Sequence, residues 1–282
     1  MAKIKFIVFT KHFKELDIDL LIEKINDMDV EGVDLCVRPG YPVNLDNIEK
    51  YLPIVVKKFK ENGLSIPMIT TPTDFVEPKD PVVEKVFYAC QMSGIKLIKI
   101  GYWFMGKDGY WKTVENIRGK IENFIKYAEK YQIKFLIHNH SGATMGLNSC
   151  SVMNLVKGFP KEYIGIFLDP GHLSIVGEPI DMAIDIVKEY ISAVAVKDLI
   201  RERIVQEGKR KWQIRVVPLG EGYVEWDKTF NKLFEINFSG PISIHSEYPE
   251  LKIDDLIDQT KIDIRYLKRV IESLKKDKNE SN

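Results

Sequence analysis

The sequence has little cysteine, no long apolar run and no excess of charge of either sign. Three cysteines in 282 residues, Cys36, Cys90 and Cys150, show no paired spacing, and we expect buried thiols rather than a disulfide framework. No segment approaches the roughly 20 consecutive apolar residues that a membrane span needs. These features predict a cytoplasmic protein that does not bind a membrane.

The balance of basic and acidic residues argues against nucleic acid as a partner. The 41 basic residues match 41 acidic ones, so the formal net charge is zero and no domain-wide positive field favours nucleic acid. The basic stretch "RERIVQEGKRKWQIR", residues 201–215, is a local cluster. A small molecule is therefore the expected partner. The oligomeric state stays open, with a homo-oligomer as one outcome.

Short β-rich runs alternate with longer amphipathic stretches along the whole chain. Predicted strands occupy 4–9, 32–37, 65–71, 96–101, 134–138, 164–169, 192–198 and 241–247, and each precedes a predicted helix, the last covering 254–275. Eight such units without a linker predict a single-domain α/β fold, a closed (β/α)8 TIM barrel over residues 1–275. The polar tail 276–282 is expected to be disordered.

The sequence has five histidines, and all of them lie at or just after a predicted strand end. Other polar residues share these positions. The full set is His12, Arg38, Thr70, Thr71, Tyr102, His138, His140, Asp169, His172, Lys197, Asp198, His245 and Glu247. Catalytic residues of such barrels lie at the carboxyl ends of the strands, where eight loops meet. The sequence therefore predicts one active site at this end of the barrel.

Imidazoles and carboxylates from strands five, six and eight form a donor set suited to a divalent transition metal. The predicted ligands are His138, Asp169, His245 and Glu247, and imidazole nitrogens favour manganese, zinc or cobalt over magnesium. Each residue also has a plainer interpretation, because a single histidine at a strand end is more often a structural hydrogen-bonding group. Lys197 and Asp198 could likewise form an ion pair of little energetic value.

The remaining roles follow from position and chemistry. In "IHNHSG" the alternation of a strand directs His138 and His140 to one side and Asn139 to the other. We predict catalytic roles for His138, His245, Lys197 and Glu247, since proton abstraction next to a carbonyl needs a base and an electrophile. Substrate-binding roles are predicted for His12, Arg38, Tyr102, His140, His172 and Asp198. Arg38 suits a carboxylate or phosphate, although pairing with a loop acid would explain it equally well.

Six motifs lie in or after the predicted strands: "GVDLCVRPG", "IHNHSG", "FLDPGHLSIVGEP", "VAVKD", "VPLGEGYVEW" and "GPISIHSEYP". Together they resemble the sugar phosphate isomerase/epimerase superfamily, the xylose isomerase-like barrels that include inosose dehydratase and, more distantly, apurinic endonuclease IV. The resemblance implies one divalent metal held by a glutamate, an aspartate, a histidine and a glutamate on strands five to eight. Asp169 matches the aspartate, and His172 matches a neighbouring histidine that contacts substrate.

This sequence departs from that ligand pattern at three of four positions. His138, Ala195 and His245 stand where the resemblance implies glutamate, histidine and glutamate, although Glu247 follows two residues later. The departures put both the metal and a mechanism with two glutamate bases in doubt.

The leading hypothesis is a metal-assisted isomerase or epimerase of a sugar, sugar phosphate or polyol derivative. A lyase that dehydrates an inosose-like keto-sugar would use the same enediolate. A catalytically silent sugar-binding barrel is the third hypothesis, and DNA repair is the least compatible with the charge balance.

Overall fold

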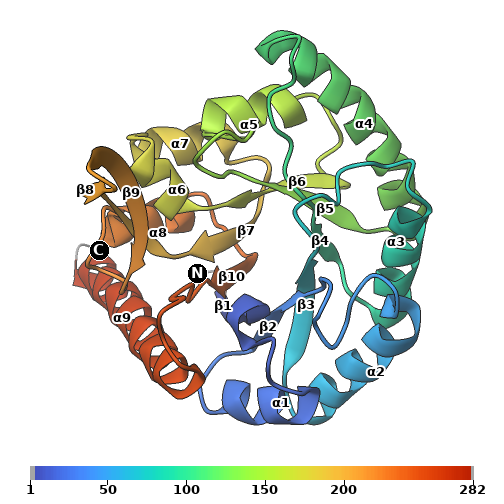
Figure 1. The fold of residues 1–282 in the computed structure, drawn as a ribbon. Helices are drawn as coiled ribbons and strands as arrows, with labels where there is room; N and C mark the ends of the chain where they lie inside the picture. The colour runs from blue at the N-terminus through green and yellow to red at the C-terminus, as the bar shows by residue number, and fades with distance from the viewer. Residues whose placement is uncertain (1–3, 281–282) are drawn as a thin grey trace.

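The computed structural model describes residues 4–280, which form a closed barrel of eight parallel strands (Figure 1). The barrel order is β1-β10-β7-β6-β5-β4-β3-β2, with β2 pairing back to β1. The barrel strands are β1 (Lys5–Phe9), β2 (Gly32–Cys36), β3 (Ser65–Thr70), β4 (Leu97–Lys99), β5 (Lys134–His138), β6 (Ile164–Leu168), β7 (Ile191–Val196) and β10 (Pro241–Ile244). The predicted single-domain (β/α)8 barrel is confirmed.

A ring of helices surrounds the strands (Figure 1). Its members are α1 (Ile18–Asn26), α2 (Ile48–Glu61), α3 (Pro81–Ser93), α4 (Tyr110–Tyr131), α5 (Ser149–Val156), α7 (Ile180–Val187), α8 (Trp226–Glu235) and α9 (Ile253–Glu280). Local chemistry sets several of their ends. The carboxylates of Asp17 and Asp80 accept backbone N–H groups at the starts of α1 and α3, and Gly94 ends α3 in the left-handed conformation.

Two apolar clusters pack on the two sides of the barrel strands, and the inner one lies directly below the site. The larger core lies between the strands and the helices. A smaller cluster fills the barrel interior, and it consists of Ile7, Met68, Leu136, Phe167, Ala193 and Ala195. The interior is therefore packed with side chains, as in other barrels of this type. Polar residues one or two positions further along the strands lie above this apolar plug, at the carboxyl end.

Three elements were not predicted: the 3-10 helix η1 (Thr10–Phe13), the short helix α6 (Pro170–Ile175) and the antiparallel hairpin of β8 (Asp198–Gln206) and β9 (Lys209–Val217). The hairpin covers the basic stretch that the sequence analysis treats as a local cluster. Its turn residues, Glu207 and Gly208, both have positive φ, +53° and +71°. This is the conformation of a type I′ turn, but Glu-Gly lacks the usual asparagine or aspartate and so gave a weak signal.

Two sequence expectations need correction. Helix α9 continues to Glu280, beyond the boundary predicted at residue 275, because Lys275 and Lys276 are good helix formers and cations suit a helix carboxyl end. Residues 281–282 of the predicted tail lie outside the described residues. Cys36 and Cys90 are buried free thiols as expected, whereas Cys150 is exposed in the first turn of α5. None of the described helices is long and apolar enough to cross a bilayer.

Candidate active site

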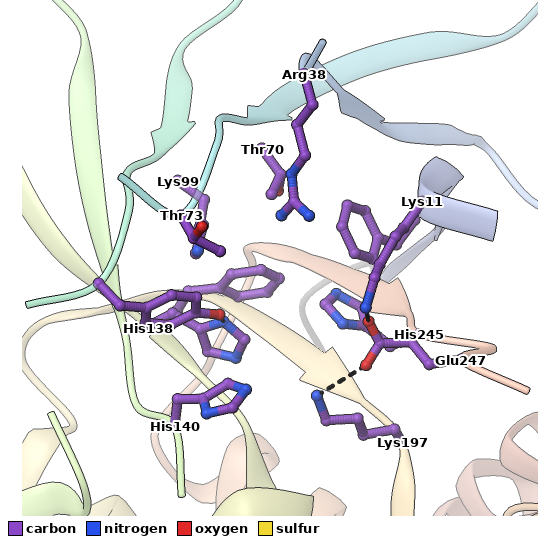
Figure 2. Close-up of a pocket in the computed structure, with 13 residues that line it drawn as sticks. Lys11, Arg38, Thr70, Thr73, Lys99, His138, His140, Lys197, His245 and Glu247 are labelled. Carbon is purple, nitrogen blue, oxygen red and sulfur yellow. Dashed lines mark hydrogen bonds and ion pairs between the residues drawn. The ribbon is translucent and has the colours of Figure 1, made fainter. Parts of the chain in front are cut away.

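A pocket opens at the carboxyl end of the barrel, directly above the apolar plug (Figure 2). Its cavity volume is about 130 Å³. The lining residues are Phe9, Lys11, Arg38, Thr70, Thr73, Lys99, Tyr102, His138, His140, Phe167, Lys197, His245 and Glu247. Every residue predicted to be catalytic lies among them, and so do three of the six predicted substrate-binding residues.

Lys197 connects two carboxylates that come from different strands. Its Nζ lies 3.2 Å from Asp169 Oδ2, at the end of β6. The same Nζ lies 3.2 Å from Glu247 Oε2, beyond β10, and Figure 2 shows this second contact. Lys197 is 4% exposed and Asp169 is fully buried. Burial disfavours the charged form of all three groups, but their mutual attraction outweighs this effect. The two carboxylates raise the pKa of Lys197, and the Lys197 ammonium holds the pKa values of both acids well below their usual range. The three groups form a buried network of full charges.

His138 is the middle member of a hydrogen-bonded chain. Its Nε2 lies 3.2 Å from Asp169 Oδ2, and its Nδ1 lies 2.8 Å from the hydroxyl of Tyr102. Because ionised Asp169 can only accept, we assign the proton to Nε2, so that Nδ1 accepts from Tyr102. Burial lowers the pKa of His138 to about 3. His138 is therefore a neutral imidazole whose basic nitrogen faces Tyr102.

His140 has a free nitrogen. Its Nδ1 donates to the carbonyl oxygen of Ser141 at 2.7 Å, and its Nε2 forms no hydrogen bond with a described residue. Its ring centroid lies 3.7 Å from that of His172, whose Nδ1 bonds to Ser141 Oγ. Burial lowers the pKa of His140 to about 4, so the ring is neutral near pH 7. His140, predicted to bind substrate, is better placed than His138 to accept a proton.

Asn139 faces away from the pocket, as strand alternation predicts. Its amide exchanges two hydrogen bonds with the backbone of Asp169, at 2.7 and 3.0 Å. These bonds fix the end of β5 against the end of β6. The "IHNHSG" segment thus directs two imidazoles into the pocket and uses the residue between them to position Asp169.

His245 lines the pocket, and the buried Asp34 lies beside it, with Oδ2 3.9 Å from His245 Nε2. His245 packs against Phe9 with ring centroids 4.5 Å apart, and its Nε2 has no hydrogen-bond partner among the described residues. Asp34, which the sequence analysis missed, accepts from Thr70 and Ser243. Burial raises the pKa of Asp34 to about 7. Its position inside β2 gave no signal, since only residues at strand ends were considered.

Three further basic side chains line the pocket. Arg38 donates through Nε to Thr71 O at 3.3 Å, forms no ion pair within the described chain and directs its guanidinium inward (Figure 2). Lys99 is 1% exposed, and its Nζ lies 3.6 Å above the Tyr102 ring with no hydrogen-bond partner in the described residues. Lys11 pairs with Glu247 at 2.7 Å. Lys99 is the last residue of β4, and a lysine inside the apolar run "KLIKIG" is a signal that could have identified it.

Three predicted substrate-binding residues do not line the pocket. His172 lies behind His140, with Nε2 3.8 Å from Asp169 Oδ2. His12 lies on η1 and lines a neighbouring depression. The buried carboxylate of Asp198 accepts four bonds, from the N–H groups of Leu199, Gly220 and Val224 and from Trp226 Nε1, at 3.0–3.1 Å. Asp198 thus has no free oxygen facing the pocket, because the chain turns outward into the hairpin at this residue.

The predicted metal ligands do not converge. Within residues 4–280, no three His, Cys, Asp or Glu side chains are arranged to hold a metal ion. The ammonium of Lys197 occupies the point between Asp169 and Glu247, His138 Nε2 is a donor, and His245 stacks on Phe9. At the position implied for a histidine ligand, Ala195 contributes a methyl group to the apolar plug. The residues present do not fit the implied metal.

Comparison with known proteins is consistent with this architecture. A model of the xylose isomerase-like TIM barrel family matches residues 22–270. The chain belongs to this family. The family accounts for the barrel and for the end at which its polar residues gather.

Individual relatives are distant. The uncharacterised protein MJ1311 of Methanocaldococcus jannaschii is 24% identical over 165 residues, which cover 58% of this chain and 52% of that protein. This chain therefore matches about half the length of that relative. The structure of an L-ribulose 3-epimerase superposes with a TM-score of 0.75 at 11% identity, covering 100% of this chain and 98% of that one. A probable 3-DHS dehydratase from Bacillus anthracis gives 0.69 at 16% identity, with 94% and 98% covered. At these identities the similarity establishes the fold.

Proposed function

We propose that the protein is an isomerase or epimerase that removes a proton next to the carbonyl of a small sugar or sugar-acid derivative. One observation carries the proposal: the free Nε2 of His140 lies in the same pocket as the ammonium of Lys197 (Figure 2). A base and a fixed positive charge are the two groups that enediolate formation needs. Structural neighbours named as sugar epimerases add support from the fold.

The chemistry can be written for the residues of this chain. His140 Nε2 takes the proton from the carbon beside the carbonyl, the C–H electron pair forms the new carbon–carbon double bond, and the carbonyl oxygen becomes an enediolate oxygen. Lys197 stabilises that negative charge. For isomerisation, protonated His140 returns the proton to the neighbouring carbon, and the proton of the adjacent hydroxyl moves to the enediolate oxygen. For epimerisation, the Tyr102 hydroxyl, which donates to His138 Nδ1 at rest, gives its proton to the opposite face of the enediolate, and solvent reprotonates Tyr102 as His140 releases the proton that it took.

The charge of the pocket supports an anionic substrate. Three cationic side chains line it, Lys11, Arg38 and Lys197, against the single lining carboxylate of Glu247. A fourth basic side chain, Lys99, also lines the pocket, and burial holds its pKa well below the usual value. Arg38 and Lys99 have no acidic partner among the residues described. A phosphate or carboxylate on the substrate would pair with them, and the guanidinium suits either group in a bidentate contact.

The predicted preference for manganese, zinc or cobalt depends on imidazole ligands, and those imidazoles have other contacts here. The proposed proton transfer does not require a metal.

The test is hydrogen exchange with solvent. The purified protein is incubated in D₂O with a panel of ketoses, ketose phosphates and keto acids, and loss of the α-proton signal is followed by NMR. We expect exchange with at least one phosphorylated or carboxylated substrate, loss of exchange in His140→Gln, and normal exchange in Glu129→Gln, an exposed change on α4. Absence of exchange across the panel would leave the silent sugar-binding barrel as the better hypothesis.

A dehydratase is the second candidate, favoured by the similarity to the probable dehydratase structure. It would form the same enediolate and then expel a β-hydroxyl group as water. Mass spectrometry of the product distinguishes the two reactions, because an isomer keeps the mass of the substrate and a dehydrated product is lighter by one water.

A further inference from the structure

We propose that the Lys197 ammonium stands in the position of a divalent metal ion, so that this barrel performs its proton transfer with a built-in cation. The inference rests on the proposed function for its chemistry, but its structural basis is independent. Lys197 Nζ lies at equal distances, 3.2 Å, from Asp169 Oδ2 and Glu247 Oε2. These two acids come from separate loops, and the ammonium is the cation that both of them contact.

The position of Lys197 is fixed by the surrounding packing. Lys197 follows β7 directly and is 4% exposed, so its aliphatic chain passes through the protein interior. Helix α6 approaches it at Gly171, where an added Cβ would lie 2.6 Å from Lys197 O and 3.2 Å from Lys197 Cγ. Glycine at position 171 therefore leaves room for the backbone of Lys197, and the aliphatic part of the Lys197 side chain packs closely against the same helix.

A metal ion would compete with the ammonium for the same oxygen atoms. A divalent ion binds carboxylate oxygens at about 2.0–2.6 Å, so an ion on Asp169 Oδ2 or Glu247 Oε2 would lie within a few ångströms of Nζ. Two cations at that separation repel strongly in a buried site. Lys11 on Glu247 and His138 on Asp169 occupy further positions around these oxygens. The wild-type arrangement therefore disfavours a metal.

Removal of the ammonium should reverse this preference. In Lys197→Ala the oxygens of Asp169 and Glu247 lose their shared cation, and the His138 imidazole stays beside Asp169. Two carboxylates and one imidazole are a donor set for zinc or manganese. The variant should gain a metal site that the wild type lacks.

The experiment is isothermal titration of zinc chloride and manganese chloride into metal-stripped protein at about pH 8. We expect a Kd weaker than about 1 mM for the wild type, and binding at least 100-fold tighter for Lys197→Ala. The matched control is Lys11→Ala, which removes the other ammonium on Glu247 but leaves Lys197 in place, and it should bind no better than the wild type. One equivalent of metal bound by the wild type below about 10 µM overturns the proposal. Weak binding by both wild type and Lys197→Ala overturns it as well.

A second measurement needs no variant and covers the case in which Lys197→Ala does not fold. The wild type is dialysed against EDTA, its metal content is determined by elemental analysis, and solvent exchange with its substrate is measured. The proposal predicts an unchanged exchange rate in metal-free protein, and loss of exchange that added metal restores would refute it. If no substrate shows exchange, the proposed function fails while the titrations still decide the role of Lys197.

Discussion

Replacing Asp198 by alanine should destabilise the barrel without removing its chemistry. Asp198 is predicted from the sequence to bind substrate, but its carboxylate accepts hydrogen bonds from Leu199, Gly220, Val224 and Trp226 and is fully buried. Three of these donors belong to the segment that returns from the hairpin to α8. Asp198 therefore holds this segment against the end of β7.

The magnitude follows from the number of donors left without an acceptor. A hydrogen bond contributes about 1 kcal/mol net, and more when the acceptor is charged, so four lost bonds predict a loss of about 4 kcal/mol or more in the free energy of unfolding. Gly222 supports the same interpretation, because a Cβ there would lie 2.0 Å from Asp198 Oδ1. Gly222 of "PLGEG" is therefore explained by the approach to this carboxylate, whereas Gly220 has a φ of +93° and a Cβ there would lie 2.7 Å from the Tyr266 ring.

The assay is urea unfolding at pH 7, combined with the solvent-exchange rate per folded molecule. Glu221→Ala, an exposed change in the same loop, is the control and should alter stability by no more than about 0.5 kcal/mol. A loss below about 1 kcal/mol in Asp198→Ala, or an intact fold with a raised KM, would refute the structural role and restore the substrate-binding prediction.

Three further changes test the pocket. Asp169→Asn should abolish hydrogen exchange of the substrate with solvent. It should also lower the free energy of unfolding by roughly 3–5 kcal/mol, because it removes one acid from the buried network around Lys197. Measuring the exchange rate and the urea midpoint together checks this. Arg38→Ala should raise KM about tenfold or more for a phosphorylated or carboxylated substrate and leave KM for its uncharged analogue unchanged, which steady-state kinetics would show. Asp34 has a pKa of about 7 in the folded protein against 3.8 ordinarily. The stabilisation from its bound proton is complete below about pH 4 and is lost as pH rises through 7, by at most about 1.4 kcal/mol per pH unit. Unfolding measured from pH 5 to pH 8 should therefore show a decline in stability that is smaller in Asp34→Asn.

The barrel was predictable because eight repeats of an apolar strand followed by an amphipathic helix have few other ways to bury both faces of every strand. The end of the barrel that carries the site was predictable for a related reason, since polar residues interrupt each strand at its carboxyl end. His138, His140, Lys197, His245 and Glu247 were all located in this way.

The contacts between side chains of the site were not predictable, because they depend on the distances between loops that are far apart in the sequence. Sequence position cannot distinguish Lys197, which points into the pocket, from Asp198, which is turned away and enclosed by four donors. It also cannot show that an ammonium, rather than an imidazole, lies nearest to Asp169 and Glu247 together. For this reason the described residues do not assemble the predicted set of metal ligands.

The hairpin leaves the barrel and returns to it at neighbouring points. Asp198 and Val217 are paired across β8 and β9, while the residues near the turn, from Val205 to Arg210, are exposed. A ribbon attached in this way can be lengthened, shortened or interrupted by a foreign domain, since the separation of its two ends stays constant. The tip between Glu207 and Gly208 is thus a natural position for a fused reporter or affinity tag, and it offers a route by which barrels of this kind acquire new modules.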